Sequence, residues 1–98
     1  MRVFVIADSQ TVLAFALAGI KGQAVHSPAE IPAILKTLDR ERTGLVLITE
    51  ALARENRQVI EEMLLEPGGT LVLEIPDTTG PQTGRAKAAE RIVSLLNR

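Results

Sequence analysis

Cysteine, tryptophan and tyrosine are absent from the 98 residues, and phenylalanine occurs only as Phe4 and Phe15. Without cysteine the chain forms neither disulfides nor thiolate metal sites. Two aromatic side chains are too few for the stacking platforms that bind single-stranded nucleic acid. No apolar run reaches the about 18 residues that suggest a transmembrane helix, and no signal peptide is evident. We therefore expect a cytoplasmic protein with no nucleic-acid partner and no direct membrane insertion.

The net charge is also small, but the charges are unevenly placed. The net charge is −1 and the pI is about 5.8, which gives no general attraction to phosphate backbones. Residues 1–84 hold 7 Lys or Arg against 11 Asp or Glu, a net charge of −4. Residues 85–98 hold four cations against one anion, a net charge of +3. The basic end is either a solvated helix face whose cations complement the helix dipole or a segment that docks on an acidic surface.

The apolar pattern, in contrast, is strong. Hydrophobic residues make up 46% of the chain, and they form four strand-like runs at residues 2–7, 23–26, 44–48 and 70–75. Helical patterns separate these runs, which is typical of repeated strand-helix-strand units with right-handed crossovers. The sequence therefore predicts an α/β fold, a small doubly wound four-stranded parallel sheet of the Rossmann-like or receiver-like kind with a C-terminal helix.

Polar residues at the ends of these runs predict where helices begin. Asp8 follows the first strand and supplies a helix cap, as does Thr49 after the third strand. Gly19 closes the first helix. Ser27 to Glu30 has the pattern of a capping box, but Pro32 delays the second helix to as late as Ile31.

The end of the chain contains a glycine-rich and proline-rich connection. We expect an α/β sheet domain at 1–76, a hinge loop at 77–84 with Gly80, Pro81 and Gly84, and a basic amphipathic helix at 85–98. The connection lies between a strand and a helix, where some proteins bind phosphate. A Walker A loop has two glycines five apart followed by Lys and Ser or Thr, whereas Gly80 and Gly84 are four apart and Arg85 follows. This segment therefore predicts a hinge.

The carboxyl edge of the expected sheet, where such folds bind ligands, offers little chemistry. The turn after the first strand lacks the glycines of a dinucleotide site. Asp8 and His26 have no evident partners for acid–base catalysis or for holding a metal. We expect no enzyme activity, no catalytic or metal-binding residues and no cofactor.

A receiver-like signalling or regulatory module is the alternative. Asp8 occupies the acidic position that receivers have at this sheet edge. Receivers also have an aspartate after the third strand and a lysine after a fifth strand, whereas this chain has Thr49 and Glu50 at the first place and lacks the second. A kinase-dependent phosphate on Asp8 would support this alternative.

The first helix is apolar all round and carries no charge between Asp8 and Lys21. A helix that packs on a sheet needs only one apolar stripe, so a second cover is required. Either the terminal helix or another protein supplies it, and both remain open. The candidate partner-binding residues come from these two helices: Leu13, Phe15, Leu17, Ile20, Ile92, Val93 and Leu96.

Three segments then carry a family resemblance. VIADSQTVLAFALAGI, LVLITEALA and LVLEIPDTTGP occur in this order along essentially the whole chain. Together they resemble the F subunit of the rotary V-type and A-type ATPases. The matching residues include Asp8, Thr11 and Phe15 in the first segment, and Gly80 with Pro81 in the last.

The resemblance implies a non-catalytic subunit of the central rotor. Such a protein binds beside the D subunit, which forms the coiled-coil shaft, inside the ring of A and B catalytic subunits. There it helps couple ATP hydrolysis or synthesis to ion transport. The resemblance also implies a peripheral attachment to the membrane through the complex. The basic C-terminal helix is then a candidate regulator, and ATP is bound and hydrolysed elsewhere.

Overall fold

The computed structural model describes residues 2–38, 43–66, 70–76 and 82–96. It contains a sheet of four strands, β1 (Arg2–Ala7), β2 (Lys21–Ala24), β3 (Thr43–Thr49) and β4 (Leu71–Ile75). The strand order is β2-β1-β3-β4 and all three pairings are parallel. The predicted doubly wound α/β fold is confirmed, and the order reverses between β1 and β3.

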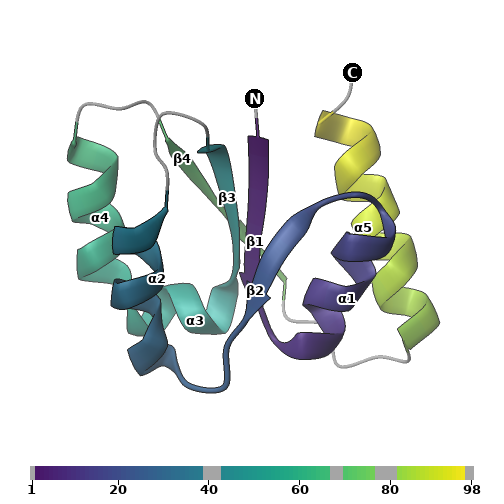
Figure 1. The fold of residues 1–98 in the computed structure, drawn as a ribbon, viewed down its shortest axis with the longest axis horizontal. Helices are drawn as coiled ribbons and strands as arrows, with labels where there is room; N and C mark the ends of the chain where they lie inside the picture. Colours follow the sequence, from purple (N-terminus) through teal and green to yellow (C-terminus); the bar gives the residue numbers. More distant parts are fainter. Residues whose placement is uncertain (1, 39–42, 67–69, 77–81, 97–98) are drawn as a thin grey trace.

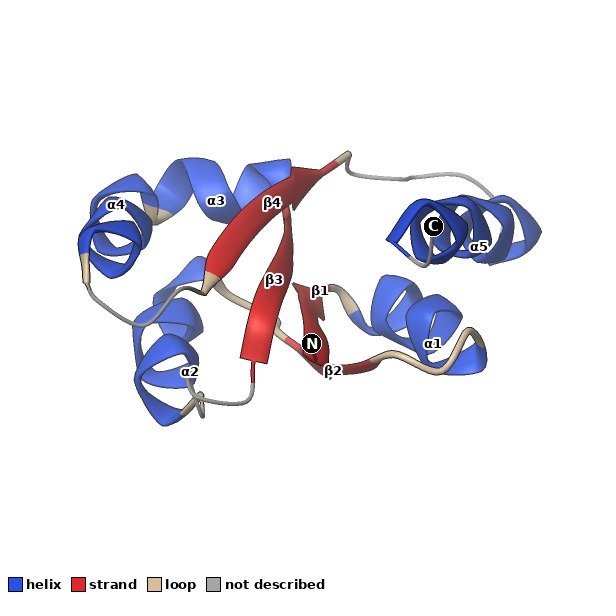
Figure 2. Ribbon diagram, turned by 90° about the horizontal axis from the view of Figure 1, so that it is seen from above, coloured by secondary structure: helices blue, strands red, loops and turns tan. Residues whose placement is uncertain are grey.

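Helices cover both faces of this sheet. One face carries α1 (Ser9–Leu17) and α5 (Gln82–Leu96), which lie side by side (Figures 1 and 2). The other face carries the 3₁₀ turn η1 (Pro28–Glu30), α2 (Ile31–Thr37), α3 (Glu50–Glu55) and α4 (Arg57–Leu65). No strand follows α5, so its place is set by packing: it contacts α1 and shares a core with it, and thereby supplies the intramolecular cover of α1.

Each face encloses its own hydrophobic core because the central strands are buried on both sides. Ile6, Val46 and Ile48 point toward α2, α3 and α4, where they pack with Ile31, Leu35 and Met63. Val5, Leu45 and Leu47 point toward α1 and α5, where they pack with Phe15 and Ala89. A strand with apolar side chains on both faces has a nearly continuous apolar sequence, which is why β1 and β3 were recognisable.

The second strand begins earlier than the sequence predicted, at Lys21 instead of residue 23. Gly22 sits opposite Val5 in the sheet. A Cβ at this position would approach the backbone oxygen of Val5 to 2.5 Å, so only glycine allows the two strands to pair here. The apolar pattern carries no sign of this strand start, because Lys21 and Gln23 are polar and exposed.

The helical pattern after β3 forms two helices rather than one. The break lies at Asn56, whose φ of −128° and ψ of 26° leave the helical region. Its side-chain amide donates hydrogen bonds to the backbone oxygens of Leu52 and Pro28, both at 3.0 Å. The second of these bonds connects the break to the η1 turn.

The last helix begins at Gln82, so Gly84 lies inside α5 instead of in the connection. Gly80 and Pro81 lie outside the described residues. A glycine in a helix interior costs about 1 kcal/mol relative to alanine, and this cost is small enough for the rest of a 15-residue helix to outweigh it.

Candidate functional site

α/β folds bind their ligands at the carboxyl edge of the sheet. At this edge, the residue that follows β1 serves as the N-cap of a helix. One carboxylate oxygen of Asp8 accepts the Thr11 backbone N–H at 3.1 Å, and the other accepts the Thr11 hydroxyl at 2.6 Å. Asp8 is thus the N-cap of α1. Both of its oxygens accept a hydrogen bond from Thr11, so the carboxylate has a structural role as a helix cap.

The neighbouring strand ends are also structural. Thr49 occupies the N-cap position of α3 but makes no side-chain hydrogen bond to that helix, and its side chain is buried. The cap therefore comes from the backbone alone. His26 is exposed, and its backbone N–H donates to the carboxylate of Glu30 at 2.7 Å.

Glu30 completes the capping box that the sequence predicted. Its Oε2 also accepts the Ser27 backbone N–H at 2.9 Å, while the Ser27 hydroxyl accepts the Ala29 N–H at 3.3 Å. The His26 and Ser27 amides, in that order of size, hold the pKa of Glu30 below its ordinary value because they bond to the charged form.

No cluster of three metal-ligating side chains occurs within the described part of the chain. A receiver site needs acidic groups converging at the ends of β1 and β3, but here Asp8 is engaged with Thr11 and the third strand ends in Thr49. No observation at this edge, over the residues that the structure describes, favours the receiver-like alternative.

The outer face of α1 exposes apolar side chains, as do the end of α4 at Leu64 and Leu65 and the strand β4 at Leu71 and Leu73. We define the α1 outer face as its exposed residues Ser9, Gln10, Leu13, Ala16 and Leu17. Leu17 is 75% exposed and Leu13 is 47% exposed. They lie one helical turn apart, so their side chains form one apolar ridge that α5 leaves uncovered.

Phe15 and Ile20, two other candidate partner-binding residues, lie in the core instead. Phe15 is 2% exposed and Ile20 is 8% exposed. The helix ends in a Schellman motif, in which the Ile20 N–H donates to the Phe15 oxygen at 2.9 Å and the Gly19 N–H donates to the Ala16 oxygen at 3.0 Å. Gly19 has a φ of +89°, which turns the chain so that Ile20 packs inward near Phe15.

The three candidates on α5 all face the core. Ile92, Val93 and Leu96 are half-buried against the core that contains Phe15. Leu95, which the sequence analysis did not single out, is exposed. The helical period could have shown that Leu95 is exposed, because the inward-facing residues Ile92, Val93 and Leu96 span about 100° around the helix axis and Leu95 lies outside that arc.

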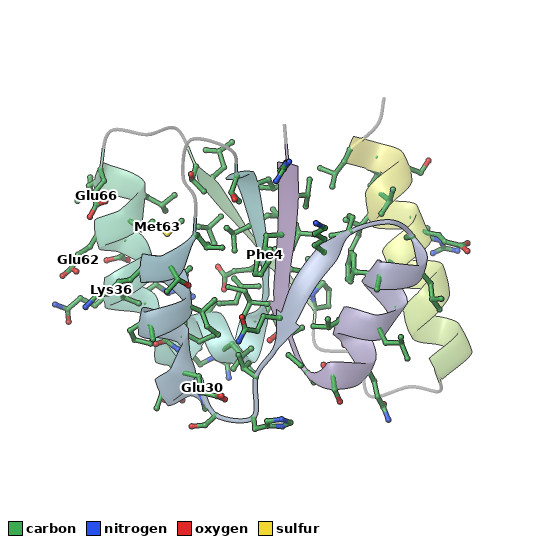
Figure 3. All side chains as sticks on the ribbon, viewed as in Figure 1. Phe4, Glu30, Lys36, Glu62, Met63 and Glu66 are labelled. Atoms are coloured by element: carbon green, nitrogen blue, oxygen red, sulfur yellow. The ribbon has the colours of Figure 1, made fainter. Side chains whose placement is uncertain are left out.

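The side of the molecule that carries α3 and α4 exposes charged side chains that are mainly acidic. The exposed glutamates of α3 and α4 include Glu55, Glu61 and Glu62, and Figure 3 shows Glu62 and Glu66 pointing outward. Arg57 forms a two-pronged ion pair with Glu74 of β4, at 3.0 and 3.1 Å. This guanidinium hydrogen bond lowers the pKa of Glu74 and raises that of Arg57.

Comparison with known proteins decides the family. Residues 3–93 match the family described as ATP synthase (F/14-kDa) subunit. The F subunit of the A-type ATP synthase of Methanothermobacter thermautotrophicus is 34% identical over 81 residues, which cover 82% of this chain and 76% of that protein. The chain belongs to the F-subunit family of ATP synthases.

Two further F subunits resemble the chain in the same way. The one from the A-type ATP synthase of Thermococcus kodakarensis is 34% identical over 95% of this chain and 90% of its own length. The one from the V-type ATP synthase of Thermus thermophilus is 36% identical over 61% of this chain and 59% of its own length. The similarity therefore extends to F subunits of both the A-type and the V-type enzymes.

Membership of this family makes the chain a non-catalytic stalk subunit of a rotary ATPase, as the sequence predicted. Ion transport is the work of the complex to which it belongs. Across the segments that the structure describes, no helix is both long and apolar enough to cross a membrane.

Proposed function

We propose that this F subunit binds the D subunit, the shaft of the central rotor, through the α1 outer face. It thereby helps couple ATP hydrolysis or synthesis in the surrounding A and B subunits to ion transport. The observation that carries the proposal is the exposed ridge of Leu13 and Leu17 on a helix without charge. Attachment to the shaft would also hold the protein at the membrane as a peripheral part of the complex.

The physical argument starts from the cost of such a surface. Exposed helix faces normally carry polar or charged residues, but residues 9–20 contain no ionisable side chain. Full burial of one leucine side chain contributes about 1.5–3 kcal/mol, so a partner that covers Leu13 and Leu17 recovers a substantial free energy. A coiled coil presents long apolar and amphipathic side chains along its length, which suits a ridge of this shape.

We further propose that α5 regulates the complex by leaving this docked position. Its inner face is only partly buried at Ile92, Val93 and Leu96, so a competing apolar surface can replace the contacts. The +3 charge of residues 85–98 suits an acidic surface on the catalytic ring. The connection through Gly80 and Pro81, with Gly84 in the first turns of the helix, is the proposed hinge.

Shaft binding is tested by introducing a charged residue into the ridge formed by Leu13 and Leu17. Leu17→Glu should leave the fold intact, because Leu17 is 75% exposed, but should weaken binding to the shaft protein at least about tenfold, since the carboxylate would be buried against an apolar partner. Leu65→Glu is the matched control, because Leu65 on α4 is 85% exposed and lies on the other face of the sheet. Binding is measured by calorimetry with the purified shaft protein.

The result expected is equal melting temperatures for all three proteins and a loss of affinity only for Leu17→Glu. If Leu17→Glu binds the shaft as tightly as the parent protein does, the α1 outer face is not the interface. If Leu65→Glu weakens binding instead, the shaft binds the face formed by α4.

A further inference from the structure

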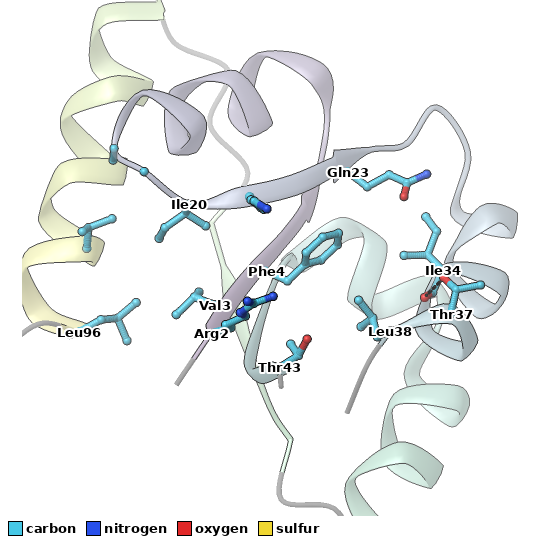
Figure 4. Close-up of a pocket in the computed structure, with 14 residues that line it drawn as sticks. Arg2, Val3, Phe4, Ile20, Gln23, Ile34, Thr37, Leu38, Thr43 and Leu96 are labelled. Atoms are coloured by element: carbon cyan, nitrogen blue, oxygen red, sulfur yellow. Dashed lines mark hydrogen bonds between the residues drawn. The ribbon is translucent and has the colours of Figure 1, made fainter. Parts of the chain in front are cut away.

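A cavity lies at the amino edge of the sheet, opposite the edge where α/β folds bind ligands. Its volume is about 680 Å³, and its walls come from the starts of β1, β2 and β3, the turn after α1 and the ends of α2 and α5 (Figure 4). Pockets that enclose small molecules measure about 300–1,000 Å³, so this cavity is large enough for a ligand.

The cavity passes from one face of the sheet to the other. β2 begins opposite Phe4, so Arg2 and Val3 have no strand beside them on the β2 side. Val3 belongs to the core under α1 and α5, whereas Phe4 belongs to the core under α2 and α4. Figure 4 shows these two side chains pointing away from each other, with Arg2 near both.

The two lobes of the cavity differ in polarity. On the α5 side the lining side chains are apolar: Val3, Ile20, Val93 and Leu96. On the α2 side, polar groups join the apolar ones: Lys21, Gln23, Thr37 and Thr43. Such a cavity suits a molecule with a hydrocarbon part and a polar head.

Two cationic side chains line the cavity, so the polar head that fits it is an anion. Arg2 and Lys21 line the cavity, and neither side chain has a hydrogen bond or an ion pair with another residue in the ranges that the structure describes. Glu30, Glu62 and the other described carboxylates do not line it. A carboxylate placed between Arg2 and Lys21 would form charge-assisted hydrogen bonds, which are about twice as strong as neutral ones.

We propose that this cavity binds a free single-chain carboxylate, with its head at Arg2 and Lys21 and its hydrocarbon chain against Val93 and Leu96. Because the hydrocarbon chain contacts α5, the bound molecule holds that helix on the sheet. Ligand binding goes beyond the proposed function and is measured on the full protein without other subunits, so it stands or fails separately from binding to the shaft.

The test uses dodecanoate below the concentration at which it forms micelles. Calorimetry should give saturable binding of one dodecanoate per protein chain. Arg2→Gln combined with Lys21→Gln should weaken it at least about tenfold, because both charge-assisted bonds are lost. Lys36→Gln is the matched control, since Lys36 is an exposed cation of α2 outside the cavity, and it should bind like the parent protein. Dodecanol, which has the hydrocarbon chain without the charge, should bind at least about tenfold more weakly.

A second measurement locates the hydrocarbon chain. Dodecanoate should slow amide hydrogen exchange in α5, and Val93→Ala should weaken binding several-fold without removing the charge preference. The proposal is overturned if dodecanoate binds only near its micelle concentration, or if the Arg2 and Lys21 variant binds it equally well. It is equally overturned if only anionic lipid vesicles or an acidic leucine-containing peptide bind, because the occupant is then a membrane or a protein.

Discussion

Single polar residues in this protein serve mainly to begin and end helices. Asp8 and Glu30 are acidic residues that follow β1 and β2 at the carboxyl edge of the sheet. Each is bound to nearby hydrogen-bond donors, Asp8 to Thr11 and Glu30 to the His26 and Ser27 amides. The edge that serves as an active site in many α/β proteins is therefore used here to fix the helices that cover the sheet.

The capping role of Glu30 gives a pH prediction. Its pKa is lowered in the folded protein, first by the His26 amide and then by the Ser27 amide. The stabilisation is therefore present above the unfolded-state pKa of about 4.3 and is lost as the pH falls through the lower folded-state value. Glu30→Gln should reduce the difference between the melting temperatures at neutral pH and in acid.

Glu90→Gln is the control for that measurement, because Glu90 is an exposed residue of α5 and takes no part in the capping box. It removes one carboxylate from the chain but should leave more of the acid sensitivity in place than Glu30→Gln does. An acid-induced fall in melting temperature that is the same in Glu30→Gln as in the parent protein would show that this carboxylate contributes nothing.

At the scale of helices and strands, α5 is the element to which we assign a regulatory role in our proposal. It contributes Ala89, which is fully buried, to the core that contains Phe15. Its other described apolar contacts are partial, and Leu95 projects into solvent. This combination allows the helix to be docked in the isolated chain and yet to be replaced by another surface.

A charge at the buried contact should therefore release α5. Ala89→Glu places a carboxylate where desolvation costs several kcal/mol, so the undocked state becomes favoured. Ser94→Glu is the matched control, because Ser94 is an exposed position of the same helix. In rotary complexes of equal composition, we expect Ala89→Glu to change the ATPase rate and Ser94→Glu to leave it unchanged. Equal rates in all three complexes would exclude α5 as a regulator.

The sequence correctly predicted the strands and the helix cap that a single local sequence pattern determines. β1 and β3 are continuous apolar runs, and the capping box of Ser27 and Glu30 is visible in the residues themselves. Ile20 was misplaced because helical spacing assigns it to the stripe of Leu13 and Leu17, whereas the Schellman motif ends the helix before it. Gly19 was the signal, but it gives the end of the helix and not the direction in which the next side chain points.

Other errors came from contacts between distant segments. The break at Asn56 is held partly by a hydrogen bond to Pro28, 28 residues earlier in the chain, and no Gly or Pro marks it. The early start of β2 depends on the fit of Gly22 against Val5. The cavity was also beyond sequence reasoning, because its walls come from five helices and strands and from the turn after α1, which meet only in the folded chain.

The whole molecule is electrically polar. Residues 50–66, which form α3 and α4, hold five glutamates against two arginines, whereas residues 85–98 carry a net charge of +3. Figure 1 places α4 and α5 at opposite ends of the molecule, and Figure 2 places them on opposite faces of the sheet. A partner that meets the α1 outer face therefore meets an uncharged surface, while the glutamates of α3 and α4 lie on the other side of the sheet.

The central claim is that this F subunit belongs to the rotor through its attachment to the shaft. The most direct test is native mass spectrometry of the rotary ATPase, purified through a tag on one of the catalytic subunits and then dissociated in steps. We predict that this chain leaves the ring together with the D subunit, in equal amounts, as one subcomplex. If it stays with the A and B subunits after the shaft has left, or if it is released alone while the shaft remains, the proposed attachment is wrong.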